Sequence, residues 1–144
     1  FPSEIDGPDQ ERVRDLGGEF GTVTGRTRRC GWLDLVALRF AVRVNGFTSL
    51  AVTKLDVLSA FDEIPVCVRY RLPDGTETAD FPANQSDFHH CTPVFETLPG
   101  WRSDLDTEAL PARARAYVDY VADALGTPVS YVGTGARREA VHAL

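Results

Sequence analysis

The apolar residues of this chain recur at helical spacing in three segments. Residues 34–45 place Leu35 and Val42 on one face, so we expect a mostly buried helix there. Residues 111–126 repeat this spacing between an initial proline and a final glycine, the usual residues at helix ends. Residues 6–18 carry polar starters and a closing glycine pair, which indicates a short surface helix.

Extended segments alternate with these helices. The segment that starts at residue 48 is apolar and β-branched, as is typical of a strand buried on both faces. Residues 64–72 alternate in the two-residue period of a half-exposed strand. A Pro-Asp-Gly turn then predicts a hairpin. In chain order we expect a buried strand starting at 48, a half-exposed strand at 64–72, a turn at 73–75, its returning strand at 76–81, an irregular stretch at 82–93, and short strands at 94–98 and 128–133. The alternation predicts one compact α/β unit.

The composition narrows the class of protein. With 21 acidic against 15 basic residues the formal charge is −6, so a broad surface for nucleic acid or an anionic membrane is not expected. A hydrophobic fraction of 43% in 144 residues is that of a globular domain with a core. No apolar run reaches the ~20 residues that span a bilayer, and no leader is visible, so we expect a cytoplasmic protein. Methionine is absent, which indicates a piece of something longer.

The cysteines do not form a metal or dithiol motif. Cys30, Cys67 and Cys91 are widely spaced, so we expect reduced thiols. His89 and His90 precede Cys91, but adjacent residues of an extended segment point to opposite faces and cannot easily share one ion. No metal site is therefore predicted in this chain.

An acidic group around Pro-Gly-Trp is a further candidate. Glu96, Asp104 and Asp106 could supply a carboxylate pair for acid–base chemistry. Nothing in the sequence defines their separation, so a solvated acidic loop is the simpler interpretation.

The stretch GTVTGRTRRCGW, Gly21 to Trp32, contains three arginines, three threonines and three glycines. Glycines let the backbone approach a ligand, hydroxyls add donors, and Arg26 and Arg28 offer planar forks that match carboxylate or phosphate. The stretch therefore predicts a local anion site. An exposed loop with solvated arginines is the alternative, although crowded arginines would repel one another without a ligand or an acidic partner.

Two further segments follow predicted strands. TKLD, Thr53 to Asp56, follows a predicted strand, and nucleotide ligands in α/β sheets lie beyond the carboxyl ends of strands. The Asp56 carboxylate could there accept hydrogen bonds from both N1–H and the exocyclic amine of guanine. In GTGARR, Gly133 to Arg138, the backbone could flank a base or ribose, although the segment lacks the ending of a P-loop. A surface Lys-Asp pair and a simple turn are the alternatives.

In this order the blocks EFGTVTGRTRRCGWLDLVALRFAVRVNG, LAVTKLDVL, FPANQ, VFETLPGW and YVGTGARR closely resemble the C-terminal portion of adenylosuccinate synthetase. The resemblance covers essentially all 144 residues. It implies an α/β fold, the C-terminal part of a P-loop-NTPase-like mixed-sheet enzyme with a β-hairpin and flanking helices. It also implies a GTP-dependent carbon–nitrogen ligase that forms adenylosuccinate from IMP and L-aspartate with Mg²⁺, as a cytoplasmic homodimer.

The resemblance implies a role for each matching residue. Arg26 would also approach IMP, and Arg28 would be shared between aspartate and GTP. The implied aspartate-binding residues are Thr22, Val23, Thr24, Gly25, Arg26, Thr27 and Arg28, and the implied GTP-binding residues are Arg28, Lys54, Leu55, Asp56, Gly133, Thr134 and Gly135. The family's phosphate loop, catalytic residues and magnesium ligands lie upstream of these blocks. We therefore expect no catalytic residue here and no activity of residues 1–144 alone.

Two other interpretations remain open at this stage. The chain could be a non-catalytic module for guanine nucleotides or anions that kept the binding loops. It could also be a truncated copy without binding or activity.

Overall fold

The computed structural model describes residues 1–103, 105 and 110–144. The chain folds as two compact units. The first unit contains Phe1–Val36 and Pro65–Glu96, and the second contains Ala37–Ile64 and Thr97–Leu144. The sequence predicted one compact unit, whereas the chain builds two separate sheets. No helix in the described part of the chain combines the length and the hydropathy needed to span a membrane.

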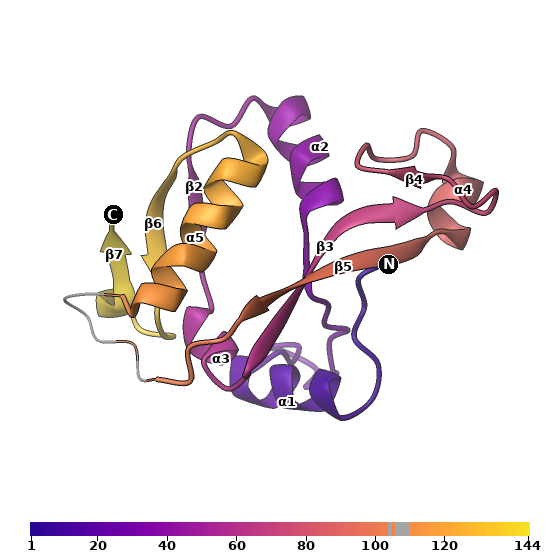
Figure 1. The fold of residues 1–144 in the computed structure, drawn as a ribbon. Helices are drawn as coiled ribbons and strands as arrows, with labels where there is room; N and C mark the ends of the chain where they lie inside the picture. Colours follow the sequence, from indigo (N-terminus) through magenta and orange to yellow (C-terminus); the bar gives the residue numbers. More distant parts are fainter. Residues whose placement is uncertain (104, 106–109) are drawn as a thin grey trace. The chain divides into compact units, whose positions relative to one another are not determined.

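The first unit is built on one mixed sheet. Strand β1 (Leu33–Asp34) runs parallel to β3 (Glu63–Arg71), and β3 pairs with both β4 (Glu77–Thr78) and β5 (Thr92–Pro99). The strands β3 and β5 form the long ribbon in Figure 1. The mixed α/β fold predicted from the sequence is confirmed.

The predicted hairpin is present at the end of β3. Arg71 lies opposite Glu77 in the antiparallel β3–β4 pair. The turn between them places Gly75 at a φ of 86°, a left-handed value that glycine adopts without strain. Asp74 accepts hydrogen bonds from the Thr76 amide and hydroxyl at 2.9 and 2.7 Å, which closes the turn.

Two helices complete the first unit. Helix α1 (Pro8–Gly17) has no buried residue, which confirms the surface helix predicted there. Helix α4 (Gln85–His90) lies in the stretch predicted to be irregular, so that prediction was wrong. The Asn84 side chain accepts a hydrogen bond from the Ser86 amide at 2.8 Å and starts the helix.

The core of the first unit is formed by residues of β3 and α4 together with Val36 and Cys91. Val36, Cys67, Tyr70 and Cys91 are buried together, and a second group packs against them: Leu72, Phe81 and Phe88. The two-residue period of residues 64–72 groups Cys67 with Arg69 and Arg71 on the polar face, but Cys67 is fully buried because β3 is covered on both faces at that position. Arg69 and Arg71 are exposed, as the two-residue period predicted.

The second unit contains a three-stranded sheet in the order β2-β6-β7. Strand β2 (Leu50–Val52) is parallel to β6 (Val129–Gly133), and β7 (Val141–Ala143) returns antiparallel to β6 after the short 3-10 helix η1 (Arg138–Ala140). Helix α3 (Leu55–Leu58) follows β2 directly. Figure 1 shows α5 (Ala112–Leu125) against β6, and the two elements are in contact.

The apolar stripe of α5 is buried as its spacing predicted. Its buried residues are Ala114, Tyr117, Val118, Val121 and Leu125, and the Tyr117 ring lies 5.6 Å from that of the buried Trp101. Gly126 ends the helix in the left-handed conformation, with its amide bonded to the Asp123 carbonyl oxygen.

Two burial predictions in the remaining segments were wrong. Helix α2 (Leu35–Asn45) is present, but only Leu35 and Val36 in its first turn are buried. Strand β2 was expected to be buried on both faces, yet Ala51 is exposed. Both segments are therefore less buried in this chain than their apolar sequences predicted.

Candidate functional site

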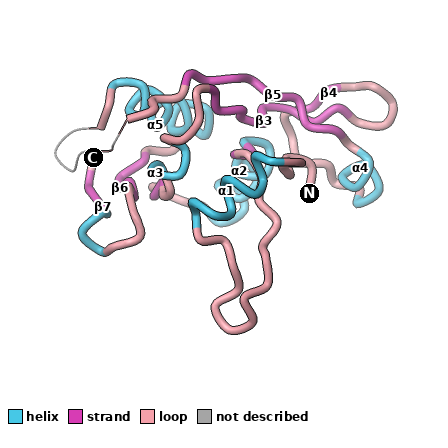
Figure 2. The backbone as a smooth tube through the Cα atoms, turned by 90° about the horizontal axis from the view of Figure 1, so that it is seen from below, coloured by secondary structure: helices cyan, strands magenta, loops and turns pink. Residues whose placement is uncertain are grey.

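The predicted aspartate-binding residues form one exposed hairpin, which we call the arginine loop (Gly21–Arg29). An isolated antiparallel bridge between Phe20 and Thr27 closes it, and the Gly21 amide donates to the Arg26 carbonyl oxygen at 2.8 Å. All of residues 22–29 are exposed. Figure 2 shows the loop as the long pink excursion that follows α1.

Backbone conformation favours a tight tip. Gly25 has a φ of 65°, a conformation that a residue with a side chain rarely adopts. Its amide donates to the Gly21 carbonyl oxygen at 2.8 Å. The Val23 side chain is 95% exposed, so the tip carries an apolar group with no cover among the described residues.

The structure supplies acidic partners for two of the three arginines. Arg29 pairs through two nitrogens with the two oxygens of Glu4, and Arg28 Nη1 lies 3.0 Å from Glu19 Oε2. The Arg26 side chain forms no hydrogen bond or ion pair with a described residue. Repulsion among the arginines predicted a ligand or an acidic partner, but no sequence pattern pointed to Glu4 or Glu19 as that partner. The one sequence feature that suggested acidic partners was the excess of positive charge in the arginine loop.

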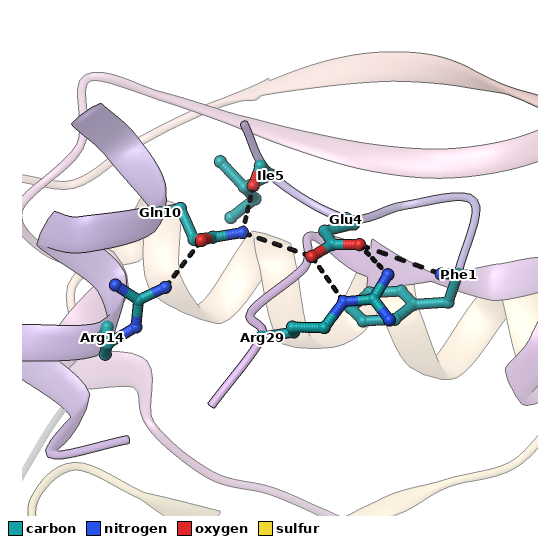
Figure 3. Close-up of polar contacts among 6 residues, drawn as sticks. All are labelled: Phe1, Glu4, Ile5, Gln10, Arg14 and Arg29. Carbon is teal, nitrogen blue, oxygen red and sulfur yellow. Dashed lines mark hydrogen bonds and ion pairs between the residues drawn. The ribbon is translucent and has the colours of Figure 1, made fainter. Parts of the chain in front are cut away.

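The base of the arginine loop is tied to α1. Arg14 Nε donates to the Arg28 carbonyl oxygen at 3.0 Å, and Arg14 Nη2 donates to Gln10 Oε1 at 2.6 Å. Gln10 Nε2 then donates to the Ile5 carbonyl oxygen at 2.5 Å, as Figure 3 shows. The same view shows Arg29 against Glu4. This network holds the second arm of the loop by its backbone.

The two segments predicted on the guanine side lie together in the second unit. Because β2 and β6 are parallel, with Val52 opposite Val132, both strands end at the same edge of the sheet. A Cβ added at Gly133 would lie 3.2 Å from the Thr53 Cβ. The backbone of the second segment therefore approaches the first so closely that a side chain at 133 would crowd Thr53.

Lys54 and Asp56 have unusual local features. Lys54 adopts a left-handed conformation with a φ of 64°, which is uncommon for a residue with a side chain and is enriched at functional sites. Asp56 lies in the first turn of α3, and its Oδ1 is buried with no hydrogen-bond partner among the described residues. A buried acceptor without a partner costs about 1–3 kcal/mol, so this oxygen is suited to accept from a ligand donor. Leu55 between them is fully buried and anchors the segment.

The groups of Thr134 are largely used within the protein. Its amide donates to the Ala140 carbonyl oxygen at 2.9 Å, and its hydroxyl lies 3.2 Å from His142 Nε2. A Cβ at Gly135 would contact the Ala140 Cβ at 3.2 Å. Thr134 and Gly135 thus close the loop between β6 and β7, and no side-chain donor of this pair is left over for a ligand.

The other sequence candidates do not form a site among the described residues. The structure describes no group of three or more His, Cys, Asp or Glu residues placed to hold a metal ion. His89 and His90 end helix α4, where His90 Nδ1 lies 2.8 Å from the Ser86 carbonyl oxygen. Glu96 is exposed on β5. Asp104 and Asp106 lie outside the described residues.

Comparison with known proteins identifies the family. The family model described as adenylosuccinate synthetase matches residues 1–142. An adenylosuccinate synthetase of Acidothermus cellulolyticus is 49% identical over 143 residues, which cover 96% of this chain and 33% of the relative. Adenylosuccinate synthetase 1 of Chromobacterium violaceum is 50% identical over 145 residues, with 98% and 33% covered.

A solved structure agrees with these relatives. The fully ligated adenylosuccinate synthetase of Plasmodium falciparum superposes with a TM-score of 0.93 at 32% identity, covering all of this chain and 36% of its own. The chain thus spans about a third of the length of the proteins it matches. With a family model that extends over nearly every residue, the chain belongs to the adenylosuccinate synthetase family.

Proposed function

We propose that residues 1–144 are the C-terminal part of a GTP-dependent ligase that forms adenylosuccinate from IMP and L-aspartate. The family match across residues 1–142 supports this reaction class. In the proposal the chain supplies aspartate binding and guanine binding, and the part of the family fold outside it supplies the catalytic residues. The resemblance also implies a cytoplasmic homodimer, which stays a prediction.

The proposed reaction has two steps. The γ-phosphoryl group of GTP passes to the 6-oxygen of IMP while N1 of the purine ring loses its proton, giving GDP and a 6-phosphoryl intermediate with a good leaving group. The aspartate amine then attacks C6, the C–O bond breaks, and phosphate leaves as the amine loses a proton. This chemistry requires an aspartate whose amine is held in position beside the purine ring.

The arginine loop is suited to hold that aspartate. Arg26 and Arg28 carry charged forks that bind carboxylates through two parallel hydrogen bonds, which fixes orientation as well as position. The hydroxyls of Thr22 and Thr24 supply further donors at the exposed tip, and Gly25 has no side chain to block the approach of a ligand. In this proposal the loop presents the amine to C6 and offsets charge on the transferred phosphoryl group.

Asp56 carries the guanine part of the proposal, and its buried, unpartnered oxygen is the single observation that supports it best. Guanine offers N1–H and the exocyclic amine on one edge, and a carboxylate accepts both. Adenine lacks that donor pair. The close approach of Gly133 to Thr53 brings the second guanine-side segment to the same edge of the sheet.

The described residues do not fit a magnesium cage of their own. Magnesium usually binds through one or two carboxylates, several waters and substrate phosphates. We therefore propose that the protein ligands of magnesium lie outside this chain. None of the roles proposed for the residues described here depends on that ion.

The test of this proposal is Asp56→Asn in the full-length protein. An amide still accepts from N1–H, but its NH₂ group faces the guanine amine and complements the 2-oxygen of xanthine instead. Loss of one charge-assisted hydrogen bond costs about 2 kcal/mol, so kcat/KM for GTP should fall roughly thirtyfold. Activity with xanthosine triphosphate should rise over the wild type.

The matched control is Asp119→Asn, an exposed residue of α5 whose carboxylate pairs with Arg115 at 3.0 Å. This variant should leave both nucleotide activities unchanged. An Asp56→Asn enzyme with the wild-type preference for GTP over xanthosine triphosphate would refute the guanine assignment.

A further inference from the structure

The two arms of the arginine loop place Glu19 directly opposite Arg28. The bridge between Phe20 and Thr27 sets the register, and the Arg28 amide donates to the Glu19 carbonyl oxygen at 3.0 Å. Residues directly opposite each other in an antiparallel pair project from the same face. The two-residue period places Arg26 on that face as well.

The ion pair between Arg28 and Glu19 uses only one edge of the guanidinium. Arg28 Nη1 donates to Glu19 Oε2 at 3.0 Å, and no other described residue accepts from this side chain. The Arg28 side chain is 54% exposed and that of Glu19 is 27% exposed, so the carboxylate is the better anchored partner. The remaining nitrogens of Arg28 stay available to an anion.

Arg29 shows the contrasting arrangement at the same loop. Its Nε lies 2.7 Å from Glu4 Oε1, and its Nη2 donates to the second oxygen of the same carboxylate. These hydrogen bonds lower the pKa of Glu4 below its ordinary value. The fork of Arg29 is thus fully matched to a carboxylate of the protein, and its remaining face lies over the Phe1 ring at 5.4 Å.

The backbone of Arg28 is already fixed from another direction. Its amide bonds to Glu19, and its carbonyl oxygen accepts from Arg14 Nε at 3.0 Å. What remains variable is the direction of the long side chain. A free arginine side chain has many rotamers, and ordering it at the moment of binding weakens affinity.

We propose that Glu19 is a positioning residue that holds Arg28 by one edge, so that its other edge faces a dicarboxylate ligand. This inference rests on the proposed function of the arginine loop. Glu19 is not itself a ligand of the substrate in this scheme. It restricts Arg28 before aspartate arrives, and Arg28 then bridges a carboxylate of the protein and one of the substrate.

The experiment compares Glu19→Ala and Glu19→Gln in the full-length protein. With alanine, KM for aspartate should rise about tenfold while KM for IMP stays within twofold, because only the direction of Arg28 is lost. The amide oxygen of glutamine can still accept from Nη1, so Glu19→Gln should restore KM for aspartate to within about threefold of the wild type. The melting temperature should not change, because an exposed ion pair contributes little to stability.

Glu4→Ala is the matched control, because it removes the other carboxylate that pairs with an arginine of this loop. It should leave KM for aspartate within twofold. A tenfold rise in this control would mean that any loss of loop charge balance has the same effect, and would overturn the assignment to Glu19.

Arg28→Ala, measured beside these variants, separates the inference from the proposed function. If Arg28→Ala raises KM for aspartate and Glu19→Ala leaves it unchanged, or lowers it as a competing carboxylate would, the positioning role is refuted and aspartate binding by the loop stands. If Arg28→Ala leaves that KM unchanged, the loop assignment itself is wrong. In the double variant, Glu19→Ala should add nothing to Arg28→Ala.

Discussion

Buried ionisable groups of the first unit are held in their neutral forms. Burial, together with the nearby charge of Asp34, raises the pKa of Cys67 to about 12. Burial and the 2.5 Å hydrogen bond to Asp34 also raise the pKa of Tyr70. Cys67 and Cys91 are therefore core residues whose thiols favour the protonated form.

This arrangement predicts the reactivity of the thiols. In the folded protein at pH 8, Cys67 should resist alkylation by iodoacetamide, because its side chain is fully buried and protonated. In urea it should react within minutes. Mass spectrometry of the alkylated peptides measures both cases, and rapid labelling of Cys67 in the native protein would contradict the burial described here.

The same thiol adds a dependence of stability on pH. Its folded pKa of about 12 exceeds the ordinary value of 9.0, so its contribution is fully present below pH 9 and is lost as the pH rises toward 12. The midpoint of urea unfolding should therefore fall between pH 8 and pH 10. Cys67→Val, which removes the thiol, should show a smaller fall over the same range.

Some residue roles could be predicted from the sequence, and others could not. The arginine stretch and the TKLD segment could be identified from side-chain chemistry, and the structure adds an unpartnered oxygen at Asp56. The sequence could not sort Arg26, Arg28 and Arg29 by their partners. That sorting depends on Glu4, which only the folding of the N-terminal segment brings to Arg29.

At the scale of elements, close backbone approach fixes where strand β5 ends. The Gly100 amide donates to the Asp62 carbonyl oxygen at 2.6 Å, and a Cβ at this glycine would lie 2.0 Å from the Phe61 carbonyl oxygen. No side chain fits there without movement of the backbone. The glycine is thus required by contact rather than by its own dihedral angles.

We expect Gly100→Ala to destabilise the protein by about 3 kcal/mol, because the added methyl meets backbone that cannot shift independently. Gly126→Ala is a useful comparison, since a Cβ there meets nothing within 4 Å but the backbone has a φ of 60°. That variant should cost only about 1 kcal/mol. Urea denaturation measures both, and equal losses would show that the contact at Gly100 is not decisive.

The helices and turns were predictable to different degrees. Helix α5 and the hairpin turn follow from local spacing and turn residues, and both were confirmed. Helix α4 was missed because its six residues are too short for a periodic signal. Its Asn84 cap was the one local feature that could have revealed it.

At the scale of the whole molecule, this chain exposes apolar side chains. The relatives contain further residues that could cover them. Phe40, Val44 and Phe47 follow helical spacing on and after α2, and their side chains are 40%, 64% and 46% exposed. The relatives are about three times as long as this chain, which covers 33% of them. We expect the remaining part of the fold to cover this stripe.

The isolated chain should consequently bind the dye ANS and aggregate at micromolar concentration, whereas the full-length protein should do neither. Val44→Lys should increase the solubility of the isolated chain, because it breaks the apolar stripe. In the full-length protein the same change should lower the melting temperature. A soluble isolated chain that melts sharply and binds no ANS would contradict this expectation.

The sequence by itself determined the three longer helices, the hairpin turn and the chemical character of the two candidate segments. Helical periods, turn residues and the clustering of arginines act over a few neighbouring positions, so they can be recognised without the fold. Tertiary structure alone decided the burial of Cys67, the exposure of α2, the approach of Gly133 to Thr53 and the pairing of Arg28 with Glu19. Each of these depends on how separate stretches of chain meet in space, where contact, desolvation and charge pairing are set by distance rather than by sequence order.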